Sequence, residues 1–127
     1  MTNLIHERCA ACRNDSPRVT DAEIAALKPQ IPDWNMIEHG KIPCLERTFH
    51  LKNFVQALDF TNQVGGLAEE EGHHPAILTE YGKVTVVWWT HAIEGLHRND
   101  FIMAAKTDQI ADRLAAADSP RPAAQTG

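Results

Sequence analysis

The sequence has few of the features that mark secreted, membrane-spanning or exported proteins. Only three of its 127 residues are cysteine, an odd number that does not suit a disulfide framework and favours a reducing compartment. No apolar run approaches the roughly 20 residues that a membrane-spanning helix needs, and the first residues lack the apolar core of a signal peptide. We therefore expect a cytoplasmic protein.

Positive charge is also scarce. Twelve Lys and Arg residues stand against 17 Asp and Glu residues, which gives a formal charge of -5, and the basic residues form no cluster along the chain. Proteins that bind nucleic acid normally concentrate Lys and Arg on one surface to neutralise phosphates. Nucleic acid is therefore not an expected partner.

The two ends of the chain differ in composition from the part between them. Residues 1–19 are polar and irregular and predict a flexible arm, whereas residues 118–127 contain two prolines and almost no apolar surface and predict a disordered tail. Cys9 and Cys12 in the arm are half of a zinc or redox pattern, and we interpret them as incidental. The folded domain is expected over residues 20–117.

Hydrophobic periodicity within this domain predicts the order helix, two strands, helix, two strands, helix. Thr20, with Glu23 three residues later, has the spacing of a capping box and should start the first helix. Strands are expected at Trp34–Glu38, Cys44–Leu51, Ala76–Glu80 and Lys83–Thr90, with turns at His39-Gly40 and Tyr81-Gly82. Further helices are expected over Asn53–Glu71 and after a cap at Asn99 or Asp100. This order suits an α+β fold in which three helices pack on one face of a four-stranded antiparallel sheet.

The last expected strand has apolar side chains on both faces. Val86 and Trp88 point to one face, and Val87 and Trp89 point to the other. An antiparallel sheet with one solvated face normally has polar side chains there. A homo-oligomer, either a dimer or a tetramer, is therefore expected to cover the second face.

Candidate catalytic side chains gather where the second long helix should end. Glu69 and His73 are four residues apart, so on a continuing helix the carboxylate would share a face with the imidazole and orient it. Pro75 ends the helix and biases His74 towards an extended backbone, so the neighbouring rings should not point in parallel directions. His91 could approach from the end of the last strand. Imidazoles can accept and return a proton near neutral pH, which suits acid and base catalysis.

Two other interpretations of these histidines remain open on residue chemistry alone. They could cap a helix end and contact solvent, or they could hold zinc or iron together with nearby carboxylates. Vicinal histidines rarely converge on one ion, so we expect no metal. The remaining histidines, His6, His39, His50 and His97, are interpreted as surface residues.

The spacing of these residues resembles the signature of the pterin-4a-carbinolamine dehydratase family. The matching motifs are Glu69-x3-His73-His74-Pro75, Tyr81-Gly82-Lys83-Val84, Thr90-His91, Gly95-Leu96 and Asp100, and the resemblance spans about residues 20–117. It implies dehydration of a 4a-hydroxytetrahydropterin to quinonoid dihydropterin and water, without metal or cofactor. It also implies a pterin substrate and a functional link to an aromatic amino acid hydroxylase.

The resemblance further implies roles for single residues. The catalytic residues would be His73, His74 and His91, and the substrate-binding residues would be Glu69, Pro75, Thr90 and Asp100. The chain departs from the best-known animal members at Gly72 and Ile77, both expected at the rim of the pocket. Because some relatives act as dimerisation partners or in enzyme assembly, a protein-binding or assembly module without dehydratase activity is the second hypothesis.

Overall fold

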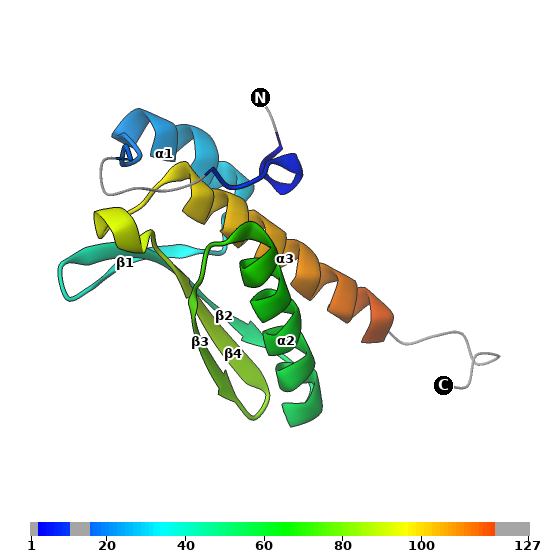
Figure 1. Cartoon of the computed structure of the whole chain (residues 1–127). Coiled ribbons are helices and arrows are strands. Elements are labelled where there is room, and N and C mark those ends of the chain that lie inside the picture. Colours follow the sequence, from blue (N-terminus) through cyan, green and yellow to red (C-terminus); the bar gives the residue numbers. More distant parts are fainter. Residues whose placement is uncertain (1–2, 11–15, 119–127) are drawn as a thin grey trace.

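Four antiparallel strands form a sheet in the order β1-β2-β4-β3 (Figure 1). The strands are β1 (Asn35–His39), β2 (Ile42–His50), β3 (Ala76–Glu80) and β4 (Lys83–Trp88). The computed structural model describes residues 3–10 and 16–118, so Cys12 and nearly all of the expected disordered tail lie outside the described residues. The antiparallel four-stranded sheet confirms the sequence prediction.

The helices lie on one side of this sheet. They are α1 (Asp21–Leu27), α2 (Phe54–Glu71) and α3 (Arg98–Asp118), with short 3-10 turns η1 (Leu4–His6), η2 (Lys28–Gln30) and η3 (His91–Ile93). Figure 1 shows α2 and α3 crossing one face, with α1 near the start of α3. The α+β fold and the order of its elements are as predicted. Within the described ranges, no helix combines the length and apolarity that crossing a membrane would need.

Local signals in the sequence account for several element ends. The hydroxyl of Thr20 accepts a hydrogen bond from the Glu23 N–H, and the Glu23 carboxylate accepts one from the Thr20 N–H, so the capping box is confirmed. The turn between β1 and β2 consists of Gly40 and Lys41, one residue later than predicted. Gly40 has a φ of 66°, which favours glycine over other residues.

The core lies between the sheet and the helices and is rich in aromatic rings. Alternate residues of β2 and β4 face α2 and α3, so Phe49 and Trp88 are almost completely buried, together with Trp34 and Phe60. The ring of Phe49 lies 5.8 Å from that of Trp34 and 4.7 Å from that of Phe60. The indole N–H of Trp88 donates to the hydroxyl of Thr107 at 3.1 Å, which satisfies a buried polar group.

The other buried indole is linked to a charged pair. Asp108 accepts from the Trp34 N–H at 2.8 Å and from the Arg47 guanidinium at 2.6 Å. β2 brings Arg47 against this side of α3, so the Asp108 side chain is only partly exposed. Burial raises the pKa of Asp108, although the hydrogen bond from Trp34 and the charge of Arg47 act in the opposite direction.

Part of the N-terminal segment also joins the core. Leu4 is fully buried, and η1 packs against α3. The Arg98 guanidinium donates two hydrogen bonds to the Glu7 carboxylate, at 2.8 and 2.6 Å. The polar composition of this segment gave no sign of these contacts, because they depend on residues about 90 positions away.

The C-terminal end of α2 depends on a glycine. Gly72 follows the helix with a left-handed backbone, at φ 65° and ψ 32°, and its N–H donates to the carbonyl of Ala68. Gly66, in contrast, is exposed inside the same helix. A Cβ atom added at either position would meet no atom within 4 Å, so the two sites differ in backbone conformation and not in space.

The same substitution should therefore have opposite effects at these two glycines. Gly72→Ala should lower the free energy of unfolding by about 1–2 kcal/mol, because a side chain is disfavoured in the left-handed region. Gly66→Ala should raise it by up to about 1 kcal/mol through higher helix propensity. Urea unfolding of both variants measures the difference, and effects of the same sign would contradict this explanation.

Acid should weaken the contact between Glu7 and Arg98. The hydrogen bond from Arg98 lowers the pKa of Glu7 below its ordinary value of 4.5, while partial burial acts to raise it. Since the folded-state pKa is lowered, the pair stabilises the fold above about pH 4.5, and this contribution is lost as the pH falls through the folded-state pKa.

Glu7→Gln should therefore reduce the free energy of unfolding by about 1 kcal/mol at neutral pH. The difference from the wild type should shrink as the pH falls towards about 3. Urea unfolding across this pH range provides the measurement, with Glu38→Gln on an exposed residue of β1 as the matched control. A difference that stayed constant with pH would exclude the proposed ion pair as its cause.

Candidate functional site

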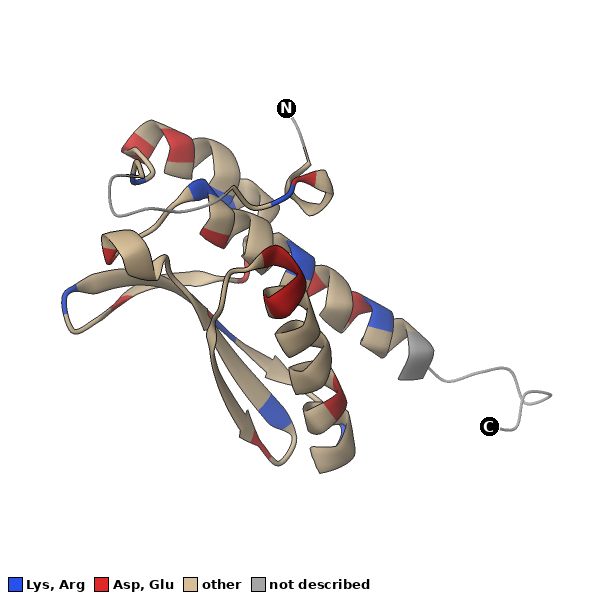
Figure 2. Ribbon diagram, in the orientation of Figure 1, with Lys and Arg blue, Asp and Glu red and all other residues tan. Residues whose placement is uncertain are grey.

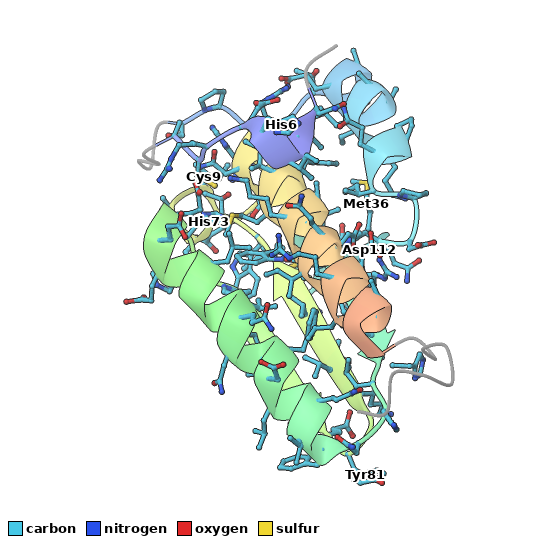
Figure 3. The ribbon with its side chains drawn as sticks, turned by 90° about the vertical axis from the view of Figure 1, so that its right-hand side faces the viewer. His6, Cys9, Met36, His73, Tyr81 and Asp112 are labelled. Atoms are coloured by element: carbon cyan, nitrogen blue, oxygen red, sulfur yellow. The ribbon has the colours of Figure 1, made fainter. Side chains whose placement is uncertain are left out.

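His73 lies directly after α2, where the left-handed Gly72 turns the chain towards the core. The N–H of His73 donates to the carbonyl of Ala68 at 3.1 Å, which fixes the backbone at the helix end. The imidazole is 7% exposed and stacks on Trp88, with 5.7 Å between ring centroids and 11° between ring planes. Figure 3 shows His73 where the end of α2 meets the start of α3.

A fully buried carboxylate, Asp100, lies against this imidazole. Its Oδ1 atom is 2.7 Å from Nε2 of His73, and its Oδ2 atom accepts hydrogen bonds from the hydroxyl of Thr90 at 2.7 Å and the N–H of His97 at 2.9 Å. These partners come from the end of α2, the segment after β4 and the start of α3. One side chain therefore connects three elements of the fold.

The start of α3 differs from the prediction that Asn99 or Asp100 caps the helix. The helix begins at Arg98, so His97 precedes it and Asp100 is its third residue, from which the carboxylate reaches back to the His97 N–H. Nδ1 of His97 also accepts from the Asn99 N–H at 3.0 Å. His97, interpreted as a surface residue, is half-buried and takes part in the start of the helix. Its position three residues before Asp100 was the signal that could have identified it.

Glu69 interacts with a different histidine from the one predicted. Its carboxylate lies 2.5 Å from Nε2 of His74, and both side chains are exposed. The expected contact with His73 does not form, because the helix ends at Glu71 and Gly72 changes the direction of the chain. The prediction that the two rings diverge is confirmed, since His73 points to the core and His74 to solvent.

His91 does not end a strand. β4 stops at Trp88, Thr90 forms an isolated bridge with Gly95, and His91 is the first residue of η3. The His91 side chain is exposed, and its ring lies 4.4 Å from that of Trp89. The segment after β4 therefore forms a short loop that presents His91 beside the end of α2.

The three histidines border a common pocket of about 350 Å³. Its lining consists of Gly72, His73, His74, Thr90, His91 and Ala92. Asp100 lies behind His73 and Glu69 contacts His74, so both carboxylates hold side chains of the pocket without lining it. Pro75 is half-buried beside the pocket lining, and Ile77, expected at the rim, packs against the hydrophobic core instead. The volume is in the range of pockets for small organic ligands.

The arrangement suits proton transfer. Among residues 3–10 and 16–118, no group of three or more His, Cys, Asp and Glu side chains is arranged to hold a metal ion. Two imidazoles from separate segments, one supported by a buried carboxylate, instead face a single solvent-accessible space. Such a pair can deliver one proton and accept another within the same pocket.

The chain is similar to known proteins of one family. The family model described as "Pterin 4 alpha carbinolamine dehydratase" matches residues 17–110. A "Putative pterin-4-alpha-carbinolamine dehydratase" of Nitrosococcus oceani is 61% identical over 110 residues, which are 87% of this chain and 97% of that protein. A "Putative pterin-4-alpha-carbinolamine dehydratase 1" of Gloeobacter violaceus is 61% identical over 114 residues, which are 90% of this chain and 98% of that protein.

Two solved structures are also similar. A transcriptional coactivator/pterin dehydratase from Brucella melitensis has a TM-score of 0.68 and 29% identity, covering 75% of this chain and 99% of the other. A pterin dehydratase-like protein identified as a RuBisCO assembly factor in the alpha-carboxysome has a TM-score of 0.51 and 26% identity. The match covers 61% of this chain and 89% of the other. The match to the family model and the curated relatives confirm the resemblance seen in the motifs, and the chain belongs to the pterin 4 alpha carbinolamine dehydratase family.

Proposed function

We propose that this protein dehydrates a 4a-hydroxytetrahydropterin to quinonoid dihydropterin and water, with histidines as acid and base, and so returns a tetrahydrobiopterin-type cofactor to use. Membership of the family supports the reaction class. The observation that carries the proposal is the buried pair of His73 and Asp100 at a pocket that His91 also borders. A product of an aromatic amino acid hydroxylase is the corresponding substrate.

The chemistry requires two proton transfers. One proton goes to the departing 4a-oxygen, so the C–O bond breaks and water leaves. Another proton leaves a ring nitrogen, and the electron pair of that N–H bond forms a C=N bond. No proton is gained or lost overall, so an acid and a base on opposite sides of the pterin are sufficient. His73 and His91 are the proposed pair.

The contact with Asp100 gives His73 a defined role in this scheme. A carboxylate at Nε2 keeps the proton on that nitrogen, which leaves Nδ1 as the atom that exchanges a proton with the substrate. Stacking on Trp88 and burial restrict rotation of the ring. His73 is thus held in one orientation before substrate binds, which reduces the entropy cost of reaching the reactive geometry.

His74 is proposed to bind the polar edge of the pterin, with Glu69 orienting its exposed ring. The hydroxyl of Thr90 donates its hydrogen bond to Asp100, so Thr90 helps to hold that carboxylate and also lines the pocket. Pro75 lies next to His74 in the sequence and restricts its backbone.

A larger pocket of about 490 Å³ lies between β2 and the end of α3. His50 is the one histidine that lines it, so this pocket offers no pair of imidazoles for acid and base catalysis.

The proposal predicts a loss of catalysis when either proton-transfer residue is removed. Purified wild-type protein should accelerate dehydration of a 4a-hydroxypterin generated in situ by a hydroxylase. His73→Ala and His91→Ala should each reduce this acceleration by about 100-fold or more, a typical contribution of acid and base catalysis. His6→Ala, at an exposed histidine of η1, is the matched control and should keep full activity. A wild-type rate equal to the spontaneous rate would disprove the proposal.

The exposed apolar side chains favour a further role in protein association. Phe54, Val55 and Leu58 on α2 are 43%, 74% and 43% exposed, and Figure 2 shows this helix almost free of charge before its acidic C-terminal end. Contiguous apolar surface of this kind marks contact sites between proteins. It supports a homo-oligomer formed through α2, on the opposite side of the sheet from the face that the sequence predicted to be covered. It also supports the second candidate function, a protein-binding or assembly module without dehydratase activity, and one similar structure is described as a RuBisCO assembly factor.

Self-association through α2 can be tested by a single charge. Val55→Glu should lower the molar mass measured by sedimentation equilibrium from that of a dimer or tetramer towards that of one chain, because a carboxylate is costly to bury in an apolar interface. Ala22→Glu, at an exposed position of α1, is the control and should leave the mass unchanged. A wild-type protein that sediments as a single chain at micromolar concentration would contradict the proposed oligomer.

A further inference from the structure

A short N-terminal segment, Glu7–Ala10, connects the end of α2 with the start of α3. The N–H of Cys9 donates to Oε1 of Glu71, the last residue of α2, at 2.9 Å. Ala10 exchanges two hydrogen bonds with Asn99 in the first turn of α3: its N–H donates to Oδ1 at 3.0 Å, and its carbonyl accepts from Nδ2 at 2.7 Å. We call Glu7–Ala10 the N-terminal clamp.

The side chains that receive the clamp are buried. Asn99 is 2% exposed, and the side chain of Glu71 is 3% exposed. Glu71 also accepts from Lys106 of α3 at 3.1 Å, which links the two helices directly. Burial acts to raise the pKa of Glu71, but the hydrogen bonds from Cys9 and Lys106 and the positive charges of Lys106 and Arg8 together keep it below its ordinary value. A third contact, between Glu7 and Arg98, fixes the other end of the clamp to α3.

These attachment points directly adjoin the proposed catalytic pair. Glu71 is two residues before His73, and Asn99 is immediately before Asp100. His73 and Asp100 are 27 residues apart in the sequence, and their 2.7 Å contact requires the end of α2 and the start of α3 to be held at a fixed separation. The clamp lies before residues 17–110, the part of the chain that the family model matches.

We infer that Glu7–Ala10 is a positioning clamp, which acts through Glu71 and Asn99 to hold the His73 ring against Asp100. This inference deepens the proposed function and rests on it where activity is concerned. Glu71 and Asn99 do not border the pocket, so their effect on the reaction passes through His73. His74 and His91 have no contact with the clamp among the hydrogen bonds described here, so substrate binding should change less than proton transfer.

The test compares substitutions in the full-length protein. Asn99→Ala removes both hydrogen bonds to Ala10, and Glu71→Ala removes the acceptor for Cys9. Glu71→Gln is the conservative partner, because it keeps an oxygen that can accept from the Cys9 N–H. Val64→Ala, in the buried face of α2 away from the clamp, is the control for a loss of stability alone.

Two measurements are made on each variant: the protonated nitrogen of the His73 ring by nitrogen NMR, and kcat and KM for dehydration. Wild type, Glu71→Gln and Val64→Ala should show one His73 tautomer with the proton on Nε2. Asn99→Ala and Glu71→Ala should show a mixture of tautomers, with kcat reduced about tenfold and KM changed less than about twofold.

The inference is overturned if Asn99→Ala and Glu71→Ala both show the single His73 tautomer of the wild type, or if Val64→Ala alters the His73 signals to the same extent. Failure of the proposed function has a different signature. In that case the wild type does not accelerate dehydration, while the His73 spectra still decide whether the clamp positions the ring. If one clamp variant does not fold, the other decides the result.

Discussion

The contact between His73 and Asp100 is the interaction on which the arrangement of this site depends. A carboxylate that is fully removed from solvent requires hydrogen-bond donors, and Asp100 has three: an imidazole, a hydroxyl and a backbone N–H. The donors belong to three segments that are distant in the sequence. The location of Asp100 in the first turn of α3 adds the favourable field of the helix N-terminus. The contacts that pack these segments together therefore also place His73 at the pocket.

The two histidines after α2 show how one backbone conformation places neighbouring side chains in two different environments. The left-handed Gly72 allows His73 to turn into the core while His74 remains at the surface with Glu69. A continuing helix would have placed His73 on the same face as Glu69, in solvent.

Much of the fold could be predicted from the sequence, because periodicity, capping and turn residues act locally. The bounds of β3 and the capping box at Thr20 are as predicted, and the residues of α2 form the predicted helix. The candidate histidines could be identified as well, but on residue chemistry alone they did not distinguish a catalytic site from a helix cap. The spacing of the motifs favoured a catalytic site, and in the structure the three rings line one pocket.

The partners of these residues could not be predicted, since they depend on tertiary contacts. The spacing of Glu69 and His73 predicted a contact between their side chains, but the helix ends before His73 and the contact does not form. The contact between Arg47 and Asp108 is equally distant in the sequence, because it joins residues 61 positions apart. The N-terminal contacts were hidden for the same reason, because a polar segment gives no sign of the buried Asn99 that receives it. Local patterns thus identified the candidate site residues, and long-range packing determined what each one contacts.

The most direct test of this account is the dehydration rate of Asp100→Asn. Oδ2 of Asp100 accepts from Thr90 and His97, so the amide oxygen should take that position and the amide NH2 group should face Nε2 of His73. Nε2 would then have to accept a hydrogen bond from this NH2 group. Nδ1 would carry the ring proton and could no longer accept a proton from the substrate. The account predicts a folded protein whose acceleration of dehydration is reduced by about 100-fold. A variant that retained the wild-type rate would contradict it.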